Sequence, residues 1–103
     1  MITVKVTYTV KPEYVQKNKE NIQVFMADFK RLDNNEFRYA VYLSGDGKTF
    51  VHLSNYNNES IQKQLLDVPS FKAFQQQRDE SGLEGIPNIE ILQPVATSRE
   101  IIN

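Results

Sequence analysis

The sequence predicts an α+β fold in which helices cover one face of a four-stranded antiparallel sheet. Three observations support this prediction. Residues 2–10 alternate between apolar and polar side chains and are rich in β-branched residues. Two helical stretches lie at residues 13–32 and 59–81, and a β-hairpin lies between them at residues 37–56. With 103 residues, the chain suits a single domain that buries roughly two-thirds of its unfolded surface.

The first strand and the first helix follow from two different periodicities. Apolar residues alternate with polar ones from Ile2 to Val10, which is the period of a strand. Pro12 then suits the first turn of a helix, because the N–H that proline lacks is not needed there. From about residue 13 to residue 32, apolar residues recur at helical spacing. This pattern predicts a long amphipathic helix with Val15, Ile22, Phe25, Met26, Phe29 and Leu32 on its apolar side.

The hairpin at residues 37–56 is the strongest local signal. Two apolar-aromatic runs flank Asp46-Gly47, which is typical of a two-residue type I′ turn with positive φ at both positions. Gly45 then pairs with Lys48, and the register continues outward. One face carries Phe37, Tyr39, Val41, Leu43, Phe50, His52, Ser54 and Tyr56, and the other carries Arg38, Ala40, Tyr42, Ser44, Thr49, Val51, Leu53 and Asn55. We assign the first face to the helices because it is bulkier.

The second half of the chain contains a broken helix and a last strand. Asn58 is a good N-cap for a helix that Pro69 interrupts and restarts, and Ser81-Gly82 ends it. A loop at residues 82–87 follows. Residues 88–93 read as a strand that Pro94 ends.

The order strand, helix, hairpin, helix, strand predicts a ferredoxin-like βαββαβ sandwich with one uncovered sheet face. We assign residues 1–96 to this domain and residues 97–103, with Ile101 and Ile102, to a C-terminal tail. The uncovered face carries Tyr42, Val51 and Leu53, and each large apolar side chain left in water forgoes about 1.5–3 kcal/mol. We therefore predict a homodimer through this sheet face.

The composition argues against several classes of function. Twelve basic and thirteen acidic residues give a formal net charge of -1, which does not favour nucleic acid or an anionic membrane as a partner. The sequence has no cysteine and one histidine, so a disulfide, a thiolate site or a histidine-rich metal site is excluded. No stretch reads as an export signal or a membrane span, so we expect a soluble, cytoplasmic protein.

Five short stretches carry a resemblance to a known family. They are Lys11-Pro12, Phe37-Arg38-Tyr39, Phe50-Val51-His52-Leu53, Tyr56-Asn57-Asn58-Glu59 and Val68-Pro69-Ser70-Phe71-Lys72-Ala73-Phe74. Together they resemble the antibiotic-biosynthesis-monooxygenase-like group of dimeric α/β barrel proteins, over most of the chain. The resemblance implies a homodimer whose two sheets pack into a barrel, with a ligand pocket between sheet and helices in each subunit. It also implies cofactor-free oxygenation of quinol-like aromatics, or haem degradation in one branch.

The haem-degrading branch is disfavoured residue by residue. Its pattern has an asparagine on the first strand, a tryptophan in the second helical region and a histidine ligand four residues after the phenylalanine that corresponds to Phe71. This sequence has Val6, Leu65 and Gln75 at these places, and it has no tryptophan. Tyr56 stands where the group often has a tryptophan at the end of the third strand.

His52 is the candidate catalytic residue. An imidazole has an unperturbed pKa near neutrality, so His52 could take a proton from a phenolic substrate. The alternative is a half-buried histidine that is hydrogen-bonded to a neighbouring tyrosine. The sequence leaves both interpretations open.

The other candidate residues are aromatic or polar neighbours of His52 in the predicted fold. Convergent polar groups in an apolar cavity are typical of small-molecule sites, although aromatic residues at these spacings also fill cores. The predicted pocket residues are Tyr8, Tyr39, Ser54, Tyr56, Phe71, Phe74, Gln75 and Arg78. Gln75 and Arg78 could orient an acidic or phenolate oxygen, or Arg78 could be a solvated residue that favours the helix dipole.

Together with these residues, the resemblance implies a cofactor-independent monooxygenase that acts on a quinol-like or polycyclic aromatic small molecule. In this hypothesis, the deprotonated substrate delivers an electron to oxygen, and the protein supplies shape and desolvation. No cofactor and no metal are expected. The alternative is a non-catalytic small-molecule-binding or scaffold dimer of the same fold, because a fold does not determine a function.

Overall fold

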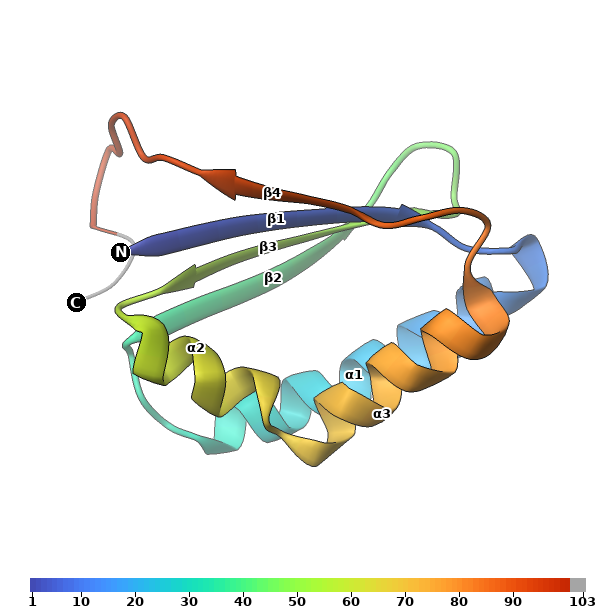
Figure 1. Ribbon diagram of the computed structural model, residues 1–103, viewed down its shortest axis with the longest axis horizontal. Helices are drawn as coiled ribbons and strands as arrows, with labels where there is room; N and C mark the ends of the chain where they lie inside the picture. The colour runs from blue at the N-terminus through green and yellow to red at the C-terminus, as the bar shows by residue number, and fades with distance from the viewer. Residues whose placement is uncertain (101–103) are drawn as a thin grey trace.

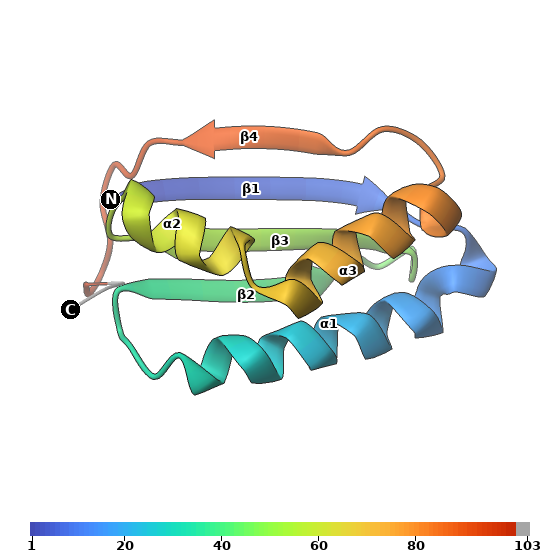
Figure 2. The same cartoon turned by 60° about the horizontal axis from the view of Figure 1, so that its bottom comes forward.

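The computed structural model describes residues 1–100 and confirms the predicted α+β architecture. The elements are β1 (Ile2–Thr9), the 3-10 turn η1 (Pro12–Tyr14), α1 (Val15–Arg31), β2 (Phe37–Leu43), β3 (Thr49–Tyr56), α2 (Glu59–Leu66), α3 (Pro69–Gln77), the π-helical turn η2 (Arg78–Gly82) and β4 (Asn88–Leu92). The strands pair antiparallel in the order β2-β3-β1-β4, which is the ferredoxin-like order. The three α-helices lie on one face of this sheet (Figures 1 and 2).

The β2–β3 hairpin has the predicted register. Val41 pairs with His52, and Tyr39 pairs with Ser54. The face assigned to the helices is also confirmed, because the side chain of His52 is 2% exposed and packs among the core residues of that side. The period-2 alternation of β3 was therefore sufficient to place the one histidine of the sequence on the face of the sheet that the helices cover.

The turn of the hairpin is wider than predicted. The two-residue type I′ turn is wrong, because Gly47 has a positive φ of 76° and Asp46 does not. Instead, Ser44 N donates to Thr49 O at 2.8 Å, and Gly47 N donates to Ser44 O at 3.0 Å. The carboxylate of Asp46 holds this loop by accepting from the backbone N–H groups of Lys48 and Thr49, both at 2.9 Å. These side-chain bonds replace the backbone pairing that a tighter turn would make.

Helix α1 lies within the predicted range and buries its apolar stripe. Pro12 opens η1, as its missing N–H allows, and α1 continues to Arg31. Ile22, Phe25 and Phe29 are buried against the sheet and α3. Asn18 is buried on the same stripe and is fully inaccessible to solvent.

The second half of the chain follows the predicted breaks. The side chain of Asn58 caps α2 by accepting from Ile61 N at 3.0 Å, and Pro69 begins α3. Helix α3 continues into η2, and this helical segment ends at Gly82 as predicted, but not because of a positive φ. A Cβ atom on Gly82 would lie 2.5 Å from ring carbons of Tyr14. Glycine is required there because η2 passes against that ring.

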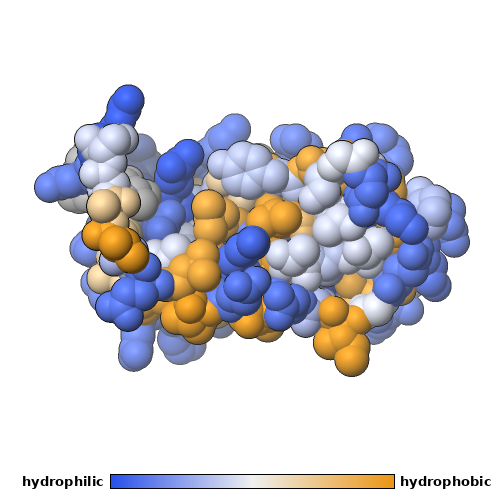
Figure 3. Space-filling view, turned by 90° about the horizontal axis from the view of Figure 1, so that it is seen from above, coloured by the Kyte–Doolittle hydropathy of each residue, from blue (hydrophilic) through white to orange (hydrophobic). Residues whose placement is uncertain are grey.

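The face of the sheet away from the helices is partly apolar, as predicted. On this face, Tyr42 is 51% exposed, Leu92 is 37% exposed and Leu53 is half-buried. Figure 3 shows apolar side chains gathered in the middle of the face, between polar ones. The face also has a polar pair that the sequence analysis did not single out, because Asn55 Nδ2 donates to Thr3 Oγ1 at 3.0 Å and both residues are buried.

Two further predictions concern the tail and the membrane. Ile101 and Ile102, in the predicted C-terminal tail, lie outside the described residues. No helix within residues 1–100 is long and apolar enough to cross a membrane.

Candidate functional site

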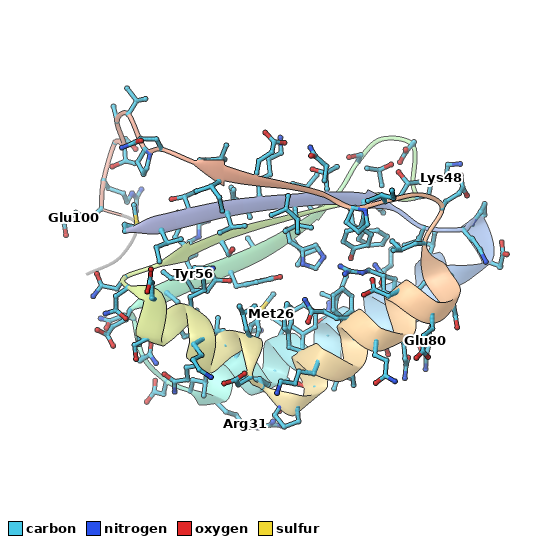
Figure 4. All side chains as sticks on the ribbon, in the orientation of Figure 1. Met26, Arg31, Lys48, Tyr56, Glu80 and Glu100 are labelled. Atoms are coloured by element: carbon cyan, nitrogen blue, oxygen red, sulfur yellow. The ribbon has the colours of Figure 1, made fainter. Side chains whose placement is uncertain are left out.

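A cavity of about 440 Å³ lies between the sheet and the segment that runs from α3 through η2 to β4. Its apolar wall consists of Val6, Phe71, Phe74, Leu83, Ile86, Pro87 and Ile89, and its polar groups come from Tyr39, His52, Gln75, Arg78 and Asp79. Ile89 reaches this side because it pairs with Val6 across β1 and β4. Figure 4 shows the side chains between sheet and helices, with Met26 and Tyr56 labelled in this layer.

His52 is held between two tyrosines in this layer. Its Nε2 atom lies 2.7 Å from the hydroxyl of Tyr8, and its Nδ1 atom lies 2.7 Å from the hydroxyl of Tyr39. Asn18 Nδ2 donates to the hydroxyl of Tyr8 at 3.0 Å. We call Asn18, Tyr8, His52 and Tyr39 the buried network. It joins α1, β1, β3 and β2, and it reaches the cavity at His52 and Tyr39.

The buried network is desolvated, which determines its ionisation. Burial, together with the positive charge of Arg78, lowers the pKa of His52 to about 3. Burial raises the pKa of Tyr8 to about 12, although the hydrogen bond from Asn18 opposes this shift. Burial also raises the pKa of Tyr39 well above its ordinary value. All three side chains are therefore neutral at physiological pH.

This geometry matches the interpretation of His52 as a histidine bonded to tyrosine, with two tyrosines in place of one. A neutral imidazole donates from one nitrogen and accepts at the other, so the two hydroxyls occupy both positions. A ligand in the cavity therefore meets an imidazole whose nitrogens are already paired. The rings of Phe74 and Phe25 stack on it, with centroids 5.5 Å and 6.2 Å away.

Arg78 brings a positive charge to the cavity. Its guanidinium carbon lies 4.8 Å from the ring centroid of Tyr8 and 5.3 Å from that of Phe74. Its Nε and Nη2 atoms donate to Asp79 Oδ1 at 3.1 Å and 3.0 Å. Arg78 is only 8% exposed, so the interpretation as a solvated helix-end residue is wrong. A buried guanidinium stacked on aromatic rings favours an anionic or acceptor group in the adjoining cavity.

The structure brings most of the predicted site residues together. Those that line the cavity are Tyr39, His52, Phe71, Phe74, Gln75 and Arg78. Tyr8 lies behind them in the buried network. Ser54 and Tyr56 do not line this cavity: both are buried, and Ser54 Oγ donates to Val4 O at 3.4 Å.

Asn18 is the residue that the sequence analysis missed. It follows Val15 by three residues and precedes Ile22 by four, so it occupies a buried position of the apolar stripe of α1. An uncharged amide at such a position was the available signal, because buried polar groups need a partner.

Two other observations delimit the site. A second cavity of about 540 Å³ lies near the end of α1 and is lined by Met26, Phe29, Lys30, Asp33, Asn34, Asn35, Phe37, Arg38 and Tyr39. It contains neither His52 nor Arg78, so we place the candidate site in the first cavity. Among residues 1–100, no group of three or more histidine, cysteine or acidic side chains is arranged to hold a metal ion.

Comparison with solved structures shows the same fold. A crystal structure described as antibiotic biosynthesis monooxygenase has a TM-score of 0.79 and 10% identity, with 93% of this chain and 100% of the other covered. Rv0793 from Mycobacterium tuberculosis has a TM-score of 0.78 and 16% identity over 95% and 98% of the two chains. A conserved protein from Methanosarcina mazei Go1 has a TM-score of 0.74 and 22% identity over 89% and 90%. No protein-family model and no curated protein matches the sequence. These comparisons show that the chain has the same fold as these solved structures.

Proposed function

We propose that the cavity binds a small aromatic molecule as its oxyanion, and that the protein is a cofactor-independent monooxygenase acting on such a quinol-like or polycyclic compound. The observation that carries the proposal is the polar wall of the cavity, where Tyr39 and Arg78 lie among lining side chains that are mostly aromatic and aliphatic. The likeness in fold to a protein described as antibiotic biosynthesis monooxygenase supports it.

The proposed reaction needs only the substrate and molecular oxygen. A CH₂ group activated by a neighbouring phenol or ketone loses a proton, and the resulting anion gives one electron to O₂. The substrate radical and superoxide combine and take up a proton to form a hydroperoxide, which loses water and leaves a carbonyl. One CH₂ and one O₂ thus become one C=O and one H₂O.

In this proposal, the side chains stabilise the substrate anion rather than perform redox chemistry. Arg78 supplies positive charge, Tyr39 supplies a hydrogen bond, and Phe71 and Phe74 exclude water, which strengthens both interactions. The role of His52 as a base stays a prediction, and its low pKa disfavours that role. We propose instead that His52 orients the hydroxyl of Tyr39.

Oxygen uptake with a panel of quinols and anthrone-like phenols tests the proposal. We expect turnover by the wild type and a loss of about tenfold to a hundredfold in kcat for Tyr39→Phe, because a hydrogen bond to a charged oxygen is removed. Tyr42→Phe is the matched control, since Tyr42 lies on β2 but on the other face of the sheet, and it should keep full activity. Equal rates for both variants would contradict the role of Tyr39.

The second candidate function is non-catalytic binding of the same class of molecule. It is favoured by the pairing of both nitrogens of His52, which leaves the imidazole no free position toward the cavity. In this case the panel raises the melting temperature of the protein without consuming oxygen. Uptake that Tyr39→Phe reduces would contradict this alternative.

We also propose that the protein is a homodimer through the uncovered sheet face. The half-exposed side chain of Tyr42, together with Val51 and Leu53, supports this proposal, because a second copy would remove these apolar groups from water.

A further inference from the structure

The buried network has one closed end and one open end. At the closed end, Asn18 is fully inaccessible, and at the open end, Tyr39 lines the cavity. Between them, Tyr8 and His52 are only 3% and 2% exposed, so water does not compete for their hydrogen bonds. Three hydrogen bonds connect the two ends, so the orientation of the Asn18 amide affects which way the hydroxyl hydrogen of Tyr39 points.

Counting hydrogens shows that the network must have a direction. Each tyrosine hydroxyl has one hydrogen, and a neutral imidazole has one N–H and one lone pair. His52 therefore accepts from one tyrosine and donates to the other. If Tyr8 donates to Nε2, then Nδ1–H donates to Tyr39, and the hydrogen of Tyr39 is free to point to the cavity. In the reverse direction, the hydroxyl of Tyr39 donates its hydrogen to Nδ1 and has none to offer to the cavity.

The amide of Asn18 distinguishes these two directions. Its nitrogen donates to the oxygen of Tyr8 and cannot accept a hydrogen bond in return. Of the two groups bonded to the hydroxyl of Tyr8, only Nε2 of His52 can therefore accept its hydrogen. Asn18 Oδ1, on the other side of the amide, is buried and has no hydrogen-bond partner among residues 1–100. Turning the amide over would put an NH₂ group with two hydrogens in that place, and unpaired buried N–H donors are rarer in proteins than unpaired carbonyls.

We propose that Asn18 is a positioning residue that sets the direction of the buried network, so that Tyr39 offers its hydroxyl hydrogen to the cavity and the site selects ligands with an acceptor oxygen. The ligand class, a phenolate or a conjugated carbonyl, rests on the proposed ligand site, whereas the direction of the network does not. Arg78, which lines the same cavity, favours the same class of ligand.

The single histidine of the sequence makes the direction measurable without any ligand. In protein labelled with ¹⁵N-histidine, the two ring nitrogens of His52 give separate signals for the protonated and the unprotonated nitrogen. We expect the hydrogen on Nδ1 in the wild type at pH 7.5. A hydrogen on Nε2 would overturn the proposal.

Two variants at the closed end test the role of Asn18. In Asn18→Asp, the carboxylate accepts the hydrogen of Tyr8, and we expect the hydrogen of His52 to move to Nε2. In Asn18→Leu, nothing orients Tyr8, and we expect signals averaged between the two tautomers. Asn21→Asp makes the same chemical change one turn along α1, at a residue that pairs with Gln77 on the surface, and should leave the wild-type signals. An unchanged Nδ1 tautomer in a folded Asn18 variant would overturn the proposal.

Binding of 4-nitrophenol tests the ligand class, because its ionised and neutral forms can be offered separately by changing the pH around its pKa. We expect the wild type to bind the ionised form about tenfold more tightly than the neutral form. The preference should disappear in Asn18→Asp and persist in Asn21→Asp. Tighter binding of the neutral form, or no binding of either form, would overturn the ligand class. If the protein prefers the ionised form of 4-nitrophenol but consumes no oxygen with the quinol panel, the proposed monooxygenase activity is contradicted and the ligand class is not.

Discussion

Buried neutral His52 should make the stability of the protein fall steeply in mild acid. Its pKa is lowered from 6.5 to about 3 in the folded protein. The unfolded chain therefore binds a proton below pH 6.5 that the folded chain does not bind. This stabilisation is fully present above pH 6.5 and is lost as the pH falls from 6.5 towards 3. From these two pKa values, the loss is about 2 kcal/mol at pH 5 and about 4 kcal/mol at pH 3.

Urea denaturation at pH 7.5 and pH 5, followed by circular dichroism, measures this effect. His52→Gln is the control, because glutamine can donate and accept hydrogen bonds but does not titrate. Carboxyl groups titrate in both proteins, so they cancel in the comparison. We expect the free energy of unfolding of the wild type to fall by about 2 kcal/mol more than that of the variant between the two pH values. Equal losses would refute the assignment of His52 as a buried, neutral group.

Three further predictions concern the fold and the assembly. Gly82→Ala should lower the free energy of unfolding by about 1–3 kcal/mol in urea denaturation, because the added Cβ would lie 2.5 Å from a tyrosine ring. Gly45→Ala is the control, because a Cβ there would have no neighbouring atom within 4 Å. Equal effects of the two substitutions would contradict the contact. Asn58→Ala should cost about 1 kcal/mol through loss of the α2 cap, and an unchanged melting temperature would show that the cap does not stabilise the helix. In sedimentation velocity, Leu53→Glu should convert a dimer to monomers, whereas Val24→Glu, at an exposed position of α1, should not; a monomeric wild type would contradict the dimer.

The sequence was sufficient to predict the order of elements and the face on which His52 lies. Both follow from periodicity, because a one-residue slip in β3 would expose every side chain that it buries. The turn of the hairpin was not predictable in the same way. Its geometry depends on the carboxylate of Asp46, whose contacts with Lys48 and Thr49 are not visible in a turn dipeptide.

The candidate site was predictable only in part. His52, Ser54 and Tyr56 share a face of β3, but a strand advances about 3.3 Å per residue. Tyr56 is therefore far along the sheet from the imidazole, and the path of α3 and η2 decides which of these positions faces open space. Asn18 was missed because its partner, Tyr8, lies on another element, and the pairing exists only in the folded chain.

The hydrogen bonds between both ring nitrogens of His52 and tyrosine hydroxyls make this residue a useful probe of folding. Its two tyrosine partners come from opposite sides of β3, 44 and 13 residues away in sequence. A compact intermediate with native helices but loose side chains would not bring these groups within hydrogen-bonding distance. The ring signals of this one histidine therefore report completed tertiary assembly, and they distinguish a fully folded molecule from a collapsed one in which far-ultraviolet dichroism is unchanged.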